Sequence, residues 1–129
     1  MVTAMDKKQY SIMIVEDEPV TAMGLQTRLR ILGHSVIGIA ATGEEAFQLV
    51  RSEKPDLVLL DVSLAGRASG IDVAKRLSIQ LPDTRFAFLT AADAADLHRE
   101  IHDLDPVAVI RKPLIDDLYI EMEDGVLQL

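Results

Sequence analysis

The sequence has no cysteine and no tryptophan, and its aromatic residues are limited to two tyrosines and three phenylalanines. The absence of cysteine excludes disulfides and thiolate metal sites, and it suits a reducing compartment. No apolar run approaches the roughly 18 to 20 residues that span a bilayer. The opening MVTAMDKKQY also lacks the apolar core of a secretion signal. We therefore expect a soluble, cytoplasmic protein with no membrane partner.

Positive charge is also scarce, because the formal net charge is −8. A general nucleic-acid binder needs the opposite sign and more aromatic side chains for base stacking. An apolar content of 49% is too high for a disordered chain, and 129 residues is a single-domain length. We expect one domain over residues 1–129, with a flexible N-terminus over about residues 1–9 and a C-terminal tail of undetermined structure over about residues 124–129.

Short apolar runs alternate with helical patterns along the whole chain, which is typical of a parallel sheet with crossover helices. The runs that predict strands cover residues 11–15, 35–40, 57–60, 86–89 and 107–110. The run at 57–60 is wholly apolar, as expected for a strand with helices over both faces. The pattern predicts an α/β protein with a doubly wound, five-stranded sheet.

Local signals mark where the helices begin and end. Pro19 suits a first helical position and Gly33 suits the C-terminal cap of the same helix. Thr42 and Glu45 have the spacing of a capping box. Helical stripes over residues 71–77 and 97–104, the latter capped by Asp93, predict two more helices. A last stripe predicts a short fifth helix; its members are Ile115, Leu118, Tyr119 and Met122.

Polar side chains stand where the predicted strands end. Glu16 and Asp17 follow the first strand and Asp61 follows the third, while Thr90 and Lys112 follow the fourth and fifth. The carboxyl ends of parallel strands form one crevice, where ligands bind in open sheets. The sequence therefore predicts a site for one divalent cation and one phosphoryl group.

The residue types at this crevice fit phosphoryl transfer. Mg²⁺ prefers oxygen ligands, and one or two carboxylates together with phosphate oxygens are sufficient to hold it. Asp61 can act as a nucleophile, since aspartate forms acyl phosphates. Thr90 and Lys112 are suitable donors to the phosphoryl oxygens.

Other polar residues have simpler interpretations. Glu18 fits the first turn of a helix, where the macrodipole favours a negative charge. His34, His98 and His102 are interpreted as solvated helix or loop residues, so a phosphorelay histidine is not expected.

The segments IMIVEDE, LVLLD, FLTA and IRKP occur in the order and at the approximate spacing of a response-regulator receiver domain, which the sequence resembles over nearly its whole length. The resemblance implies a flavodoxin-like (βα)5 fold with strand order 2-1-3-4-5. It implies Asp61 as the phosphoacceptor, with Thr90 and Lys112 assisting. It also implies Mg²⁺, or Mn²⁺ in its place, on Glu16, Asp17, Asp61 and the backbone carbonyl of Ser63, and a cis Lys112–Pro113 bond.

Three features depart from the family pattern. Val109 occupies a position that is usually aromatic, so the aromatic half of the usual switch is absent. Ala65 stands where proline is usual, and Gly70 comes about one residue late, so we expect the loop after Asp61 to follow a different path. The predicted last helix is short and acidic.

The resemblance implies a phosphoacceptor signalling protein rather than an enzyme acting on outside substrates. A metal-dependent aspartate phosphatase is disfavoured because Asp17 is followed by Glu18 and Pro19, not by the second aspartate of an Asp-x-Asp motif. The expected partners are a histidine kinase or phosphotransfer protein and a downstream protein, with no output domain in this chain, which we expect to be a monomer or weak dimer. A phosphate sink and a phosphorylation-independent binding module remain as alternatives.

Overall fold

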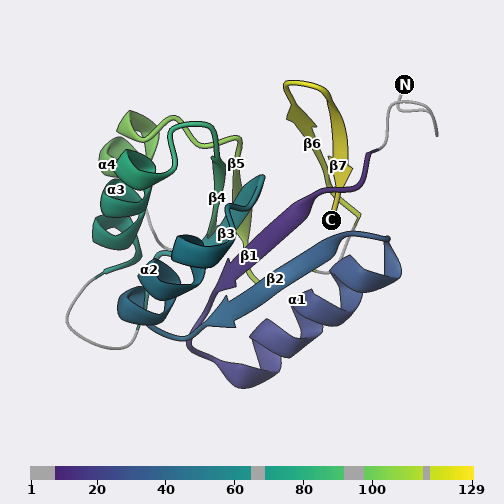
Figure 1. The fold of residues 1–129 in the computed structure, drawn as a ribbon, viewed down its shortest axis with the longest axis horizontal. Helices are drawn as coiled ribbons and strands as arrows, with labels where there is room; N and C mark the ends of the chain where they lie inside the picture. The colour runs from purple at the N-terminus through teal and green to yellow at the C-terminus, as the bar shows by residue number, and fades with distance from the viewer. Residues whose placement is uncertain (1–7, 65–68, 92–97, 115–116) are drawn as a thin grey trace.

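The structure, a computed structural model, describes residues 8–64, 69–91, 98–114 and 117–129. Figure 1 shows the arrangement of its helices and strands. The strands are β1 (Ser11–Val15), β2 (Ser35–Ala40), β3 (Leu57–Asp61), β4 (Arg85–Thr90), β5 (Ala108–Arg111), β6 (Tyr119–Met122) and β7 (Gly125–Gln128). The helices are α1 (Pro19–Ile31), α2 (Gly43–Ser52), α3 (Gly70–Gln80) and α4 (His98–Asp103).

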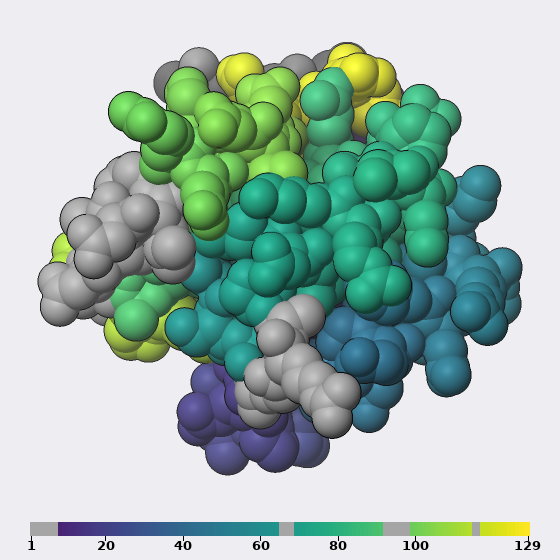
Figure 2. Space-filling view, turned by 90° about the vertical axis from the view of Figure 1, so that its left-hand side faces the viewer, coloured from purple at the N-terminus to yellow at the C-terminus, as the bar shows by residue number. Residues whose placement is uncertain are grey.

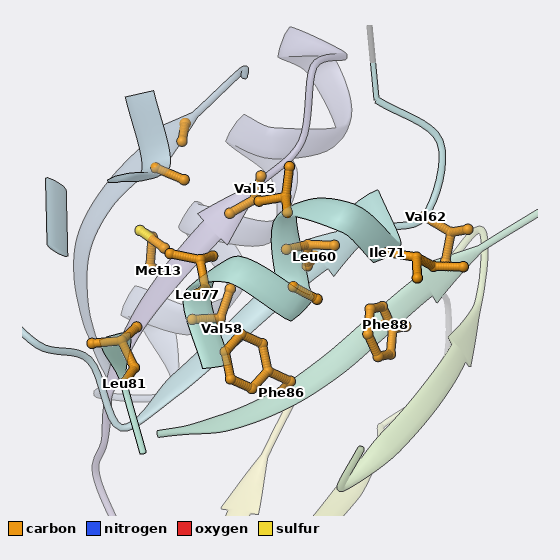
Figure 3. Close-up of a cluster of buried hydrophobic side chains, with 14 of the residues drawn as sticks. Met13, Val15, Val58, Leu60, Val62, Ile71, Leu77, Leu81, Phe86 and Phe88 are labelled. Carbon is orange, nitrogen blue, oxygen red and sulfur yellow. The ribbon is translucent and has the colours of Figure 1, made fainter. Parts of the chain in front are cut away.

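Five strands form a parallel sheet in the order β2-β1-β3-β4-β5, which confirms the predicted fold class. Every residue of β3 is buried, in agreement with its unbroken apolar run. Alternate side chains of the strands enter two separate cores. One core contacts α2, α3 and α4, and Figure 3 shows part of it, with Phe86 and Phe88 of β4 near Leu77 and Ile71 of α3.

The opposite face of the sheet packs against α1 and the C-terminal segment. Figure 2 shows the side of the molecule that α2, α3 and α4 cover. Among the described residues, no helix is long and apolar enough to cross a membrane.

The predicted ends of α1 and the predicted capping box of α2 are confirmed. α1 begins at Pro19, and Gly33 follows its C-terminal cap with a φ of 92°. Such a positive φ favours glycine because it has no Cβ. The Thr42 hydroxyl accepts a hydrogen bond from the backbone N–H of Glu45 at 3.2 Å. The predicted cap of α4, Asp93, lies outside the described residues, as do Ala65 and most of the flexible N-terminus predicted over residues 1–9.

The predicted fifth helix is wrong: residues 119–122 form a strand, and most of the tail that the sequence left undetermined, residues 124–129, forms a second one. The segment forms an antiparallel β-hairpin of β6 and β7, in which Ile120 pairs with Leu127. Both side chains are buried, at 2% and 0% exposure. Leu118 and Met122, each two positions from Ile120, pack against the same core. The segment therefore alternates as a strand does, and the helical spacing of Leu118 and Met122 is coincidental. Backbone hydrogen bonds between Leu118 and Leu129 extend the hairpin.

The interpretation of His34 as a solvated residue is also wrong, since it is only 5% exposed. Its Nδ1 accepts a hydrogen bond from the backbone N–H of Tyr10 at 3.1 Å. Its Nε2 lies 2.8 Å from the carbonyl oxygen of Gln128, to which a neutral ring donates. His34 thus joins the residue before β1 to the hairpin. Arg28 of α1 makes a second connection to the C-terminal segment by donating to the carbonyl oxygen of Leu129 at 2.9 Å.

Candidate acidic site at the carboxyl ends of the strands

The acidic residues meet because β1 and β3 are adjacent and in register. Val15 pairs with Leu60, which places the Glu16–Asp17 turn beside Asp61. The backbone N–H of Glu16 also donates to the carbonyl oxygen of Ala40 on β2 at 2.9 Å, which fixes the turn. One carboxylate oxygen from each of Glu16, Asp17 and Asp61 lies within 4.8 Å of the others. The predicted cluster is present.

Lys112 reaches this cluster from the end of β5. Its backbone N–H donates to the carbonyl oxygen of Thr90 at 2.9 Å, which joins β5 to β4. The Lys112–Pro113 bond is cis, as the resemblance implied. The Lys112 Nζ donates to Asp61 Oδ2 at 2.7 Å and to Glu16 Oε1 at 3.1 Å. The ammonium group therefore bridges carboxylates from two neighbouring strand ends.

Asp61 is buried, and both of its carboxylate oxygens accept hydrogen bonds. The residue is 4% exposed, and its Oδ1 accepts a hydrogen bond from the backbone N–H of Ser63 at 2.9 Å. Its other oxygen, Oδ2, accepts from Lys112. These contacts fix the orientation of the Asp61 carboxylate and compensate for its burial.

Burial and crowding perturb the charges of the site. Burial raises the pKa of Glu16 to about 7, the proximity of Asp61 adds to the rise, and Lys112 opposes it. Burial also acts to lower the pKa of Lys112, but its hydrogen bonds and ion pairs with Asp61 and Glu16 outweigh this, so the pKa is raised. Two buried carboxylates thus share one ammonium group, and the site is short of positive charge.

The remaining predicted residues have different surroundings. Thr90 is 9% exposed, and its hydroxyl donates to the carbonyl oxygen of Ala91 at 3.1 Å. Ser63 contacts Asp61 through its backbone N–H, while the predicted role of its carbonyl as a ligand stays a prediction. Val109, at the usually aromatic position, is 49% exposed.

Gly70 contributes to the site in a way that the sequence did not reveal. A Cβ at this position would lie 1.9 Å from the Asp61 carbonyl oxygen. The backbone N–H of Gly70 donates to the carbonyl oxygen of Val62 at 2.9 Å, so α3 begins directly against the chain that leaves β3. Only glycine permits this approach. Its shifted position relative to the family pattern was the one available signal.

The donor set fits a divalent cation. All three carboxylates offer hard oxygen atoms, and magnesium requires only some of its ligands from protein. Glu16 Oε2 lies 3.0 Å from Lys112 Nζ as an ion pair, yet the geometry does not form a hydrogen bond. A buried carboxylate oxygen without a hydrogen bond is costly, and a cation would satisfy it. Glu16, Asp17 and Asp61 could therefore hold a divalent metal ion.

Comparison with known proteins identifies the family. Residues 12–122 match the response regulator receiver domain, and the chain belongs to this family of two-component signalling proteins. It is 32% identical over 118 residues to sporulation initiation phosphotransferase F of Bacillus subtilis, covering 92% of this chain and 84% of that protein. It is 38% identical over 103 residues to the phyllosphere-induced regulator PhyR of Methylorubrum extorquens, covering 79% of this chain and 38% of PhyR. The chain thus spans well under half of PhyR.

Solved structures support the same assignment. The signal receiver domain of a modulated diguanylate cyclase from Desulfovibrio desulfuricans has a TM-score of 0.76 and 28% identity, covering 84% of this chain and 85% of that one. That structure is described as an example of alternate folding. The receiver domain of PhyR from Erythrobacter litoralis has a TM-score of 0.68 and 36% identity, covering 86% of this chain and 82% of that one.

Proposed function

We propose that the protein accepts a phosphoryl group on Asp61 from a histidine kinase or a phosphotransfer protein and signals through contacts with other proteins. The observation that supports this most directly is the pairing of Asp61 Oδ2 with Lys112 Nζ at 2.7 Å beside the Glu16–Asp17 pair. The Asp61 carboxylate, the Lys112 ammonium group and two further carboxylates thus lie together at one point. Membership of the receiver family supports the same role.

In this proposal the residues of the site have separate tasks. Asp17 and Glu16 would hold Mg²⁺ together with Asp61 and the Ser63 carbonyl, and the ion would supply positive charge to offset an incoming phosphoryl group. Lys112 already contacts Asp61, so a small movement would let its ammonium group pair with a phosphoryl oxygen on that residue. The Ser63 N–H keeps the carboxylate oriented. Positioning and charge neutralisation are the main sources of catalysis in phosphoryl transfer.

Thr90 completes the proposed response. Its hydroxyl donates to the backbone at Ala91, and its strand lies between β3 and β5. A phosphoryl group on Asp61 would offer stronger acceptor oxygens to this hydroxyl. The exposed Val109 has no aromatic ring to turn inward. We therefore place the conformational response in the Thr90 hydroxyl and the Lys112 side chain.

A role as a relay intermediate or phosphate sink is the second candidate. The relative from Bacillus subtilis is named a phosphotransferase, and this chain covers 84% of it. In such a role the phosphoryl group would leave Asp61 for a histidine of another protein.

The test is phosphorylation by acetyl phosphate in the presence of Mg²⁺, followed by intact-mass spectrometry. The wild type is expected to gain the mass of one phosphoryl group, and Asp61→Asn is expected to gain none, because its amide is not a nucleophile. Asp83→Asn is the matched control, since Asp83 is exposed and remote from the cluster in sequence. Phosphorylation of Asp61→Asn, or none of the wild type with any phosphoryl donor, would contradict the proposal.

A further inference from the structure

One edge of the C-terminal hairpin is joined to the segment before β1 (Figure 1). Val126 and Gln128 lie two positions apart on β7, so their carbonyl groups point to the same edge. The Val126 carbonyl accepts from the backbone N–H of Lys8 at 3.0 Å, and the Gln128 carbonyl oxygen lies 2.8 Å from Nε2 of His34. Nδ1 of the same ring accepts from the backbone N–H of Tyr10. These contacts form a joint between β7 and the segment before β1, and His34 bridges it.

The partners of the His34 ring fix its protonation state. A backbone N–H group can only donate, so Nδ1 must be unprotonated to accept from Tyr10. A carbonyl oxygen can only accept, so Nε2 must carry the proton that it donates to Gln128. Both contacts exist together only when the ring is neutral, with its proton on Nε2. A second proton, on Nδ1, would point at the Tyr10 N–H group, and the joint would lose this contact.

Burial adds to the cost of a charged ring. His34 and Tyr10 are both only 5% exposed, so water has little access to the ring nitrogens or to the Tyr10 N–H group. Within the part of the chain that the structure describes, the ring forms no ion pair with a carboxylate. A buried charge without a partner and a buried donor without an acceptor both cost free energy. Protonation of His34 therefore acts against the joint.

The charged groups on the elements around the ring are held by other contacts or lie in solvent. They are Lys8 before β1, Arg28 and Arg30 on α1, Asp117 before β6, and Glu121, Glu123 and Asp124 of the hairpin. Lys8 pairs with Asp124 at 3.8 Å, and Arg28 pairs with Asp117 at 3.2 Å. Glu123 contacts Arg85, while Arg30 and Glu121 are exposed.

The Tyr10 side chain, which packs beside the ring, does not titrate in the same range. Its ring centroid lies 6.2 Å from that of His34, and its hydroxyl donates to Asp124 at 3.2 Å. Burial raises the pKa of Tyr10 to about 12, and the hydrogen bond to Asp124 and the charges of Asp124 and Asp56 add to the rise. Tyr10 therefore stays neutral where histidine changes charge, between about pH 5 and 8.

We propose that His34 is a proton-sensitive latch of the C-terminal hairpin. The neutral ring closes the joint between β7 and the segment before β1, and a second proton on the ring opens it. Because histidine changes charge between about pH 5 and 8, mildly acidic conditions are sufficient. An open joint gives other molecules access to apolar side chains that the hairpin buries, among them Ile120 and Leu127. The surface that the protein offers to partners then depends on pH.

The latch is separate from the acidic site in both position and sign. None of its contacts involves Asp61 or Lys112, so it can fail while the proposed function holds. Glu16, with its pKa raised to about 7, contributes stability that is lost as the pH rises. The closed latch excludes a proton that the open chain accepts, so its contribution is lost as the pH falls. A measurement at the hairpin can therefore distinguish the two titrations.

Amide hydrogen exchange of the full chain, followed by NMR, tests the latch. Protection factors correct each amide for the intrinsic effect of pH, and they are compared at about pH 7.5 and about pH 5.5. The Tyr10 and Leu129 amides are expected to lose protection by about tenfold or more at the lower pH, because the joint opens locally. The Leu59 amide, in the central strand β3, should not lose protection. Unchanged protection of Tyr10 and Leu129, or an equal loss at Leu59, would overturn the proposal.

The His34 ring is observed in the same samples. Long-range proton–nitrogen spectra are expected to show the neutral ring with its proton on Nε2 at about pH 7.5. The second proton should be added over the same pH range in which the Tyr10 amide loses protection. A ring with its proton on Nδ1 at about pH 7.5, or a ring that stays neutral down to about pH 5, would overturn the proposal.

His34→Gln is the matched variant without a titrating group. Its amide has one acceptor and one donor end, for Tyr10 and Gln128, and it never gains a charge. The Tyr10 amide should therefore keep its protection at both pH values. His102→Gln is the control, since His102 is exposed on α4, and it should show the pH dependence of the wild type. The wild-type pH dependence in His34→Gln, or its loss in His102→Gln, would overturn the proposal. The wild-type measurements still decide the matter if a substitution at this buried position unfolds the chain.

Discussion

Lys112 Nζ lies 2.7 Å from Asp61 Oδ2 and 3.1 Å from Glu16 Oε1, so one ammonium group serves two carboxylates from different strand ends. Asp61 and Glu16 are almost completely buried, whereas the Lys112 side chain is 28% exposed. Because the ammonium group is the only cation that the described residues bring into contact with this pair, the metal-free site depends on it. The ion pairs of Lys112 are thus part of the structure of the metal-free site.

Lys112→Met is therefore expected to destabilise the metal-free protein by about 1 to 3 kcal/mol, since it leaves two buried carboxylates without their cation. Mg²⁺ should recover more stability in this variant than in the wild type. Urea unfolding with and without Mg²⁺ measures both quantities. Lys54→Met, at an exposed position before β3, is the control and should change little. An unchanged midpoint for Lys112→Met would show that the bridge contributes nothing.

The raised pKa of Glu16 predicts an unusual pH dependence. Its pKa is about 7 in the folded chain against an ordinary value of 4.5, so between these pH values the folded state holds a proton that the unfolded state has released. This contribution to stability is complete below about pH 4.5 and is lost as the pH rises through 7. The loss is on the order of 1 to 3 kcal/mol.

Glu16→Gln isolates this effect, because its amide stays neutral. Without metal, the variant should be more stable than the wild type at pH 8, and the difference should shrink towards zero near pH 4.5. Denaturant unfolding across this pH range is the measurement. A stability difference that is the same at both ends would mean that Glu16 does not titrate there.

Asp17→Asn tests the cation site directly. The substitution removes one charge from the three-carboxylate cluster, so the affinity for Mg²⁺ should fall by about tenfold or more. Glu18→Gln is a close control, because Glu18 lies next to Asp17 but outside the cluster and serves as the N-cap of α1. Isothermal titration calorimetry or Mn²⁺ relaxation would report the affinities. If both variants lose the same Mg²⁺ affinity, the loss reflects only the smaller negative charge of the protein, and Asp17 is not a ligand.

The placement of the candidate site residues could be predicted from sequence because it follows from the sheet alone. Glu16, Asp61, Thr90 and Lys112 each end or follow a strand, and parallel strands align those ends without any further information. The helix caps at Gly33 and Thr42 were equally local signals. What these predictions share is that they require no knowledge of long-range side-chain packing.

The hairpin could not be predicted, because tertiary contacts decide its structure. Residues 118–122 fit both a helical and an alternating pattern, and short segments have weak intrinsic preferences. Leu127 is buried against the sheet, and Gln128 contacts His34, which lies just before β2. Both contacts are made with residues that are far from the hairpin in the sequence. His34 was misread for the same reason, since its two partners are distant in sequence.

Gly70 gives the sharpest test of the packing around Asp61. Gly70→Ala would place a Cβ 1.9 Å from the Asp61 carbonyl oxygen, so α3 or the end of β3 must move. We expect a loss of stability of about 2 to 4 kcal/mol, together with slower phosphorylation, because Asp61 is displaced. Gly24→Ala is the matched control, since nothing lies within 4 Å of its Cβ, and it should stabilise α1 by up to about 1 kcal/mol. If the two alanine variants unfold at the same denaturant concentration, the close contact between α3 and Asp61 is not a constraint on the fold.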